Sequence, residues 1–194
     1  MNRNAGVVAI SHESPGAVMN LLRGAGIIVA GSALIALSAH VSIPLWFTPV
    51  PVTLQPFAVV LLGLLLGPQL AFATMVTYLA EGAAGLPVFT PNGLGGVAQL
   101  LGPTGGYLLS YPLVAPLVSV LWRRSGRSFS RGLVVAGTGN LVILAMGAVW
   151  LAVLTHAAAD TVLNHAVLPF LPGDVLKVVA AAGIAAGAAR WRRS

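Results

Sequence analysis

The chain has 194 residues, of which 57% are hydrophobic and only 7% are charged, and its formal net charge is +6. A soluble domain carries roughly a quarter charged residues, so this composition excludes the ordinary soluble class. The basic residues stand in short clusters at the ends of apolar runs, which is typical of membrane anchoring and does not indicate nucleic-acid binding. The chain has no cysteine, which excludes disulfides and thiol chemistry.

Six apolar runs follow one another, and each is close to the roughly 20 residues that a membrane span needs. They cover residues 24–39, 52–67, 69–84, 106–122, 132–154 and 173–191. This pattern predicts an all-α membrane protein of about six transmembrane helices, forming a single membrane domain over residues 1–194. The polar residues 1–22 are expected to form an N-terminal cytoplasmic tail.

Two connections between the runs are rich in helix-breaking residues. Residues 40–51 contain three prolines, which exclude a regular helix, so a loop is expected there with Trp46 and Phe47 at the membrane surface. Residues 85–105 are rich in glycine and proline but also apolar. We therefore expect this second connection to form a packed, re-entrant or lid-like loop on the outer side.

The distribution of Lys and Arg predicts the orientation. Arg23 precedes the first run, four arginines lie within residues 123–131, and three lie within residues 190–193. The predicted outer loops contain neither Lys nor Arg, and the only exception to the pattern is Lys177, inside the sixth run. Because basic loops stay in the cytoplasm, both termini are expected inside, in a multi-pass protein of the cytoplasmic membrane, with residues 123–131 as a cytoplasmic loop.

Asp174 and Lys177 are the most informative polar pair. They stand three residues apart near the start of the sixth run and therefore share one helix face. A charge at the bilayer centre costs about 2.5–3.5 kcal/mol on the insertion scale, so such residues indicate a functional site by default. In that interpretation both face a cavity, where Lys177 takes an anion and Asp174 accepts hydrogen bonds. Alternatively, they pair with each other, or Lys177 extends to the membrane surface.

Other polar residues are weaker candidates. Glu81 either faces the same cavity or lies in the outer interface, and Gln55 and Asn92 contact either a ligand or solvent. The glycine-rich residues 102–107 open the fourth helix. Free amides at a helix start favour a polar or anionic ligand, although the same sequence also suits a tight helix entry. The four histidines have no metal-ligand spacing, so no metal site is predicted.

The first run carries small residues at four-residue spacing, in the pairs Gly26 with Ala30 and Ser32 with Ala36. Such a face permits close helix contact, either within the protein or with a partner.

No phosphate-binding loop of the Gly-x-x-x-x-Gly-Lys-Ser/Thr type occurs, so the chain has no ATPase motif of that kind. Three functions remain open: a substrate-binding transport subunit, an intramembrane enzyme, and a structural membrane partner. An enzyme would have only Asp174, Lys177 and Glu81 for its chemistry, and we predict that the chain is not one.

Four segments resemble one known family. They are residues 49–55 (PVPVTLQ), 85–89 (GLPVF), 102–108 (GPTGGYL) and 169–174 (PFLPGD) followed by Lys177. In this order and spacing, from about Gly31 to Ala182, they resemble the BioY family, the biotin-specific substrate-binding S components of energy-coupling-factor (ECF) transporters.

The resemblance implies biotin uptake through six membrane helices, with an outward-opening pocket for high-affinity binding. It implies a transmembrane coupling subunit and ABC-type ATPase subunits as partners, although some family members have no dedicated partners and transport by such a chain alone stays open. The small-residue face of the first helix is then the contact with the coupling subunit. Biotin's valerate anion suits Lys177, its ureido ring suits Asp174 and Asn92, and its apolar body suits Phe89 and Tyr107. Gln55 and Glu81 complete the implied set of biotin-binding residues.

Overall fold

The structure, a computed structural model, describes residues 15–192, so most of the expected N-terminal tail lies outside the described residues. The helices are α1 (Pro15–His40), α2 (Gln55–Leu65), α3 (Pro68–Ala83), α4 (Gly96–Leu101), α5 (Gly105–Arg124), α6 (Phe129–Thr155), α7 (Ala159–Ala166) and α8 (Leu171–Trp191), and the strands are β1 (Ser42–Ile43) and β2 (Val52–Thr53). Each of the six apolar runs lies largely within one of these helices.

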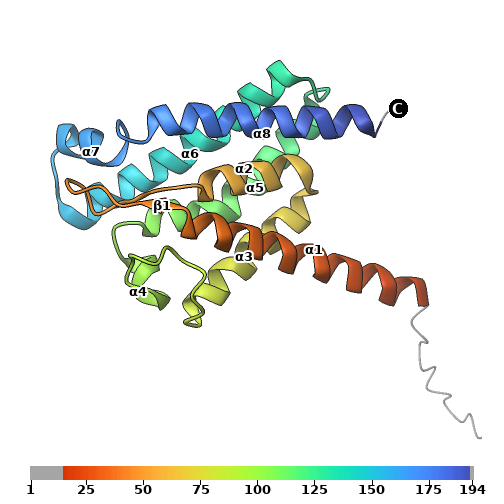
Figure 1. Cartoon of the computed structure of the whole chain (residues 1–194), viewed down its shortest axis with the longest axis horizontal. Coiled ribbons are helices and arrows are strands. Elements are labelled where there is room, and N and C mark those ends of the chain that lie inside the picture. The colour runs from red at the N-terminus through yellow and green to blue at the C-terminus, as the bar shows by residue number, and fades with distance from the viewer. Residues whose placement is uncertain (1–14, 193–194) are drawn as a thin grey trace, which may run out of the picture.

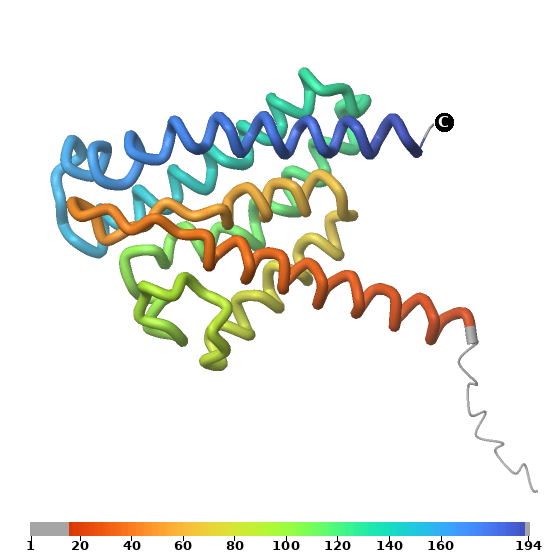
Figure 2. Tube along the Cα trace, viewed as in Figure 1, coloured from red at the N-terminus to blue at the C-terminus, as the bar shows by residue number. Residues whose placement is uncertain are grey.

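Helices α1, α2, α3, α5, α6 and α8 run alternately between two ends of the molecule (Figure 1). One end holds the β-hairpin, α4 and α7, and we call it the hairpin end. The other holds the start of α1, the α2–α3 turn, the α5–α6 loop and the end of α8, and Figure 2 shows these segments together on the right. Because the clustered arginines belong to these segments, we call this the arginine end.

Four helices are long and apolar enough to cross a membrane, judged by length and composition: α1, α5, α6 and α8. Helix α2 has 11 residues and α3 has 16, which makes them shorter than the expected spans. At 1.5 Å per residue α2 is only about 16 Å long. Each helix has a proline in its first turn, which explains why neither extends further toward its N-terminus. The Gly67–Pro68 pair also separates the end of α2 from the start of α3.

Helix α2 lies in the centre of the bundle and packs against α1, α5, α6 and α8. Most of its residues are buried, whereas only 22% of the apolar window of α1 is buried. Irregular backbone at membrane depth is tolerated where protein surrounds it. The short central α2 satisfies this condition.

Two connections contain more structure than expected. The ends of the proline-rich loop pair as an antiparallel hairpin with Ser42 opposite Thr53, and Trp46 in the intervening loop is 96% exposed. The glycine- and proline-rich connection contains α4, which begins at Gly96, and both Gly96 and the preceding Gly95 have positive φ. The connection after α6 contains α7. Thr48 donates a hydrogen bond of 2.8 Å to the His165 carbonyl, and this bond ties the hairpin loop to α7.

Candidate functional site

A cavity at the hairpin end is lined by segments that lie between Val50 and Lys177 in the chain. Its space amounts to about 540 Å³, including the open mouth. The lining residues come from the hairpin and the start of α2 (Val50, Pro51, Thr53, Gln55, Pro56), from the α3–α5 connection (Phe89, Thr90, Gln99, Thr104), from α5 and α6 (Tyr107, Leu108, Tyr111, Ile143, Leu144), and from the start of α8 and its N-cap (Phe170, Asp174, Lys177). The cavity is therefore largely apolar, with polar groups on several sides.

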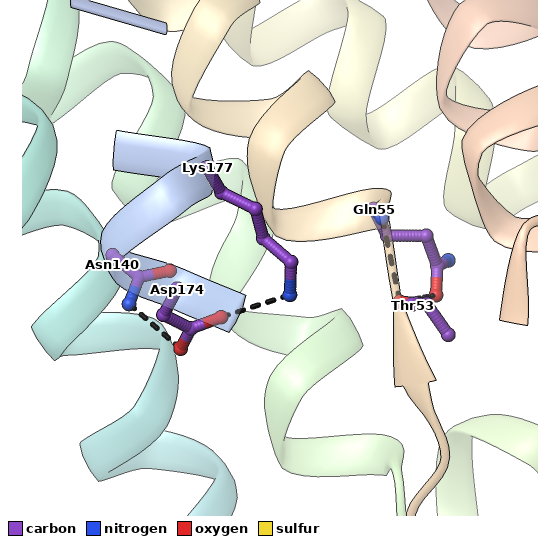
Figure 3. Close-up of polar contacts among 5 residues, drawn as sticks. All are labelled: Thr53, Gln55, Asn140, Asp174 and Lys177. Atoms are coloured by element: carbon purple, nitrogen blue, oxygen red, sulfur yellow. Dashed lines mark hydrogen bonds and ion pairs between the residues drawn. The ribbon is translucent and has the colours of Figure 1, made fainter. Parts of the chain in front are cut away.

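Asp174 and Lys177 form a buried ion pair inside this cavity. The Lys177 ammonium donates to one Asp174 carboxylate oxygen at 2.9 Å, and the Asn140 amide of α6 donates to the other at 2.9 Å (Figure 3). The two charged residues are only 4% and 8% exposed. The two residues therefore pair with each other, which was one of the alternatives open from the sequence, and they also line a cavity. An ammonium has three donors, so Lys177 keeps capacity for a further acceptor.

Gln55 faces this pair across the cavity (Figure 3) and is itself held in place. Its carbonyl accepts a hydrogen bond of 3.2 Å from Thr53, and its amide donates to the Tyr78 hydroxyl of α3. Tyr78 in turn donates to the Val88 carbonyl at 3.1 Å. This chain of bonds fixes the Gln55 amide and ties the connection after α3 to α2.

Two aromatic residues of the cavity wall, Tyr107 and Phe89, are held in place by contacts with neighbouring groups. The Tyr107 hydroxyl donates to the Ala166 carbonyl of α7 at 2.7 Å, and its ring lies 6.2 Å from that of Phe170. The Phe89 ring packs edge-on against Tyr78 at 5.5 Å and covers Gly82, where any side chain would collide with it. Both rings therefore present a rigid apolar surface to the cavity.

Thr90 is the one buried side-chain polar group without a hydrogen-bond partner among residues 15–192. Thr90 lines both the cavity and the adjoining space under the α3–α4 loop. Its neighbour Gln99, by contrast, donates to Thr104 at 2.6 Å. A buried hydroxyl without a partner costs free energy, so Thr90 is suited to a ligand that supplies the missing bond.

Five of the seven predicted binding residues line the cavity: Gln55, Phe89, Tyr107, Asp174 and Lys177. Two lie outside it. Glu81 accepts a hydrogen bond from Ser32 of α1, and Asn92 is exposed and borders the adjoining space instead. Glu81 and Asn92 therefore do not line the cavity in this arrangement, because the Glu81 carboxylate is bonded to α1 and the loop places Asn92 on the outside.

The four predicted partner-contact residues divide between two faces of α1. Gly26 and Ala30 are exposed, Ala36 is half-buried, and Ser32 is completely buried. Ser32 therefore serves the α1–α3 contact through Glu81 and does not lie on the exposed face, which corrects the expectation for this residue.

The glycines of residues 102–107 allow the start of α5 to pack closely against α6. A side chain at Gly106 would meet the Trp150 side chain and the Met146 carbonyl of α6, and the Trp150 indole donates to the Gly102 carbonyl at 2.9 Å. The sequence therefore forms a tight helix entry, which brings Thr104 and Tyr107 to the cavity wall.

Sequence reasoning missed Asn140 and Thr90. Asn140 is an isolated polar residue within an apolar run, and this is a signal that could have identified it, because a buried amide in a span needs a partner. Thr90 had no such signal, since a threonine beside Pro91 in a connection is ordinary.

The comparisons with known proteins agree with this fold. The family model for the BioY family matches residues 11–194. The chain belongs to the BioY family. It is therefore an integral membrane protein, as its apolar helices indicate.

Curated relatives in this family cover most of the chain. The probable biotin transporter BioY of Pyrococcus horikoshii is 39% identical over 153 residues, which is 79% of this chain and 88% of the relative. The biotin transporter BioY of Thermotoga maritima is 39% identical over 154 residues, with the same shares. The biotin transporter BioY2 of Lactococcus lactis is 33% identical over 153 residues, 79% of this chain and 82% of the relative.

A solved structure has the same fold. It is a crystal structure of the S-component for biotin from an ECF-type ABC transporter. Its TM-score is 0.79 at 27% sequence identity, and the match covers 94% of this chain and 95% of that one.

Proposed function

We propose that this protein binds biotin in the cavity at the hairpin end and mediates its uptake. The single observation that carries this proposal is the buried Asp174–Lys177 pair inside an apolar cavity, in a chain whose relatives are named biotin transporters. It is a transport protein and not an enzyme, because the BioY family consists of transporter components.

Biotin's chemistry matches the lining. Its valerate is an anion, and Lys177 is the cation of the cavity, with donors left after pairing with Asp174. Its ureido ring carries two N–H donors and one carbonyl, for which the Asp174 carboxylate and the fixed Gln55 amide are complementary groups. Its bicyclic body fits between Phe89, Tyr107 and Phe170, which are held in place from outside the cavity.

We further propose that the chain crosses the cytoplasmic membrane six times, with the arginine end inside. The hairpin, α4 and α7 then cover the cavity on the outer side. The exposed face of α1 with Gly26 and Ala30 is the contact for a transmembrane coupling subunit, and ABC-type ATPase subunits supply the energy. The poor burial of α1 supports this assignment, because a peripheral helix can accept a partner without opening the bundle.

Direct binding tests the proposal. The chain purified in detergent should bind biotin without nucleotide, as measured by calorimetry. Binding that requires ATP, or tighter binding of riboflavin or thiamine, contradicts the proposal.

Substitution of Lys177 tests the role of the ion pair. Lys177→Ala should weaken biotin binding by about 30-fold or more, because truncation of one partner of a buried charge pair costs about 2–5 kcal/mol. A neutral biotin amide should lose much less, since it has no carboxylate. Asp174→Asn should weaken both ligands alike. The double variant Lys177→Ala/Asp174→Asn removes the unpaired carboxylate and serves as the control for folding. Equal losses for biotin and the amide in both Lys177 variants would assign Lys177 to the fold alone.

A further inference from the structure

A second pocket lies at the arginine end, between the ends of α2, α5 and α8. Its space amounts to about 400 Å³, including the open mouth, and it is lined by apolar residues of α2 and α8, by Trp122, and by the three arginines Arg123, Arg127 and Arg192. None of its lining residues also lines the cavity at the hairpin end. We call it the arginine pocket.

Within residues 15–192, the arginine pocket has a high positive charge without an acidic counter-charge. The acidic residues of the described chain are Glu81, Asp160 and Asp174, and none of them lines it. Asp174 is paired with Lys177, and the three arginines form no ion pair within residues 15–192. The three side chains are exposed, and cations that converge without an acid still repel one another, so a bound anion would stabilise the arrangement.

The arginines are positioned by specific backbone features. Arg123 lies over Gly67 in the α2–α3 turn, where a β-carbon would come within 2.8 Å of its guanidinium. Arg127 follows Gly126, and both adopt left-handed backbone conformations, with φ of 56° and 71° respectively. Such a conformation is unfavourable for a residue with a side chain and persists only where its surroundings impose it. It reverses the chain after α5 and brings Arg127 to the pocket.

We propose that the arginine pocket binds the phosphate of an anionic phospholipid. Guanidinium groups match the oxygen geometry of phosphate, and basic pockets between membrane helices suit anionic head groups. The apolar lining accommodates the glycerol region, and Ile184 and Trp191 of the same helix α8 are exposed and available to the acyl chains. The proposal goes beyond biotin uptake and does not depend on it, because the two sites lie at opposite ends.

Native mass spectrometry of the full chain in detergent tests this site. The probes are phosphatidylglycerol, the zwitterionic phosphatidylcholine, and inorganic phosphate as a soluble competitor. Phosphatidylglycerol should bind in preference to phosphatidylcholine. The variant Arg123→Gln/Arg192→Gln should weaken its binding by roughly 10- to 30-fold.

Arg124 and Arg190 provide a matched control. They lie next to or near the pocket arginines on the same helices, are exposed, and do not line the pocket. Arg124→Gln/Arg190→Gln removes the same charge and should leave lipid binding within about twofold, because the pocket itself is intact. If the double pocket variant does not fold, Arg127→Gln in the α5–α6 loop tests the same pocket, with the unfolding temperature as the check.

Three outcomes would overturn the proposal. Equal losses in both double variants would show that net charge alone attracts the lipid. Inorganic phosphate that displaces the lipid at equal concentration would identify a free anion as the ligand. Unchanged lipid binding in the pocket variant, together with lost co-purification of ATPase subunits, would assign the arginines to a protein partner.

Discussion

The polar side chains of the cavity differ in whether their hydrogen-bonding groups have partners. Asp174 has both carboxylate oxygens bonded, one to Lys177 and one to Asn140, so its charge is compensated in the absence of any ligand. A buried charge that loses its partner is costly, and this pairing explains how the cavity retains a cation at membrane depth. Thr90 is the opposite case, since its buried hydroxyl has no partner within the described residues.

Thr90→Val separates ligand binding from stability. Valine has nearly the same shape, so the unfolding temperature should stay equal or rise when the unpaired hydroxyl is removed. Biotin affinity, measured by calorimetry, should fall by about 2- to 12-fold, which corresponds to one hydrogen bond of roughly 0.5–1.5 kcal/mol. The control Thr74→Val removes a hydroxyl that donates to the Leu70 carbonyl outside the cavity, so it should lower stability and leave affinity unchanged. An unchanged affinity in Thr90→Val would exclude a ligand contact for this hydroxyl.

Close approach of the helices depends on glycine at particular contacts. A β-carbon at Gly63 of α2 would lie 2.8 Å from the Ala115 carbonyl of α5 and 2.9 Å from the Val118 side chain. Small residues at such contacts let membrane helices pack backbone to backbone. Since α2 carries Gln55 at its start, the α2–α5 contact also sets the width of the cavity.

Gly63→Ala should destabilise the protein by about 1–3 kcal/mol, because the carbonyl it meets belongs to the backbone and cannot move aside. Thermal unfolding in detergent is the measurement. Gly137→Ala on α6 is the control, since no atom lies within 4 Å of the added carbon there. That control should be neutral or slightly stabilising, because alanine favours helix over glycine. Equal destabilisation by both substitutions would refute the close α2–α5 contact.

The two ends of the molecule differ in charge and in structure. The arginine end gathers segments from the start, middle and end of the described chain, and the hairpin end carries the cavity and its covering elements (Figure 1). Because basic segments remain in the cytoplasm, this polarity supports an outward-opening cavity.

Single introduced cysteines test this orientation without background labelling of the protein, since the native chain contains no cysteine. Ser130→Cys at the start of α6 should react with an impermeant maleimide only in inside-out vesicles. Thr161→Cys on α7 should react only in intact cells. Both native residues are exposed, so a lack of reaction does not arise from burial. Labelling of Ser130→Cys in intact cells would reverse the proposed orientation.

The sequence by itself determined the membrane class, the approximate limits of six helices and the placement of Asp174 and Lys177 on one helix face, whereas their pairing was only one of the alternatives that it left open. The length of an apolar run and the three-residue spacing of Asp174 and Lys177 are local properties of the sequence. They can be read from neighbouring residues without knowledge of the rest of the chain. Five of the seven predicted binding residues line the cavity, and all five belong to the four segments that resemble the BioY family.

Only the tertiary structure decided which distant groups meet. Asn140 reaches Asp174 because α6 packs against α8, and Ser32 takes Glu81 because α1 packs against α3. Helices α4 and α7 have 6 and 8 residues, too few for an apolar periodicity to predict them. The arginine pocket likewise depends on three helix ends that converge. A sequence records the charge of each side chain, but the packing of the helices decides which charges share one space.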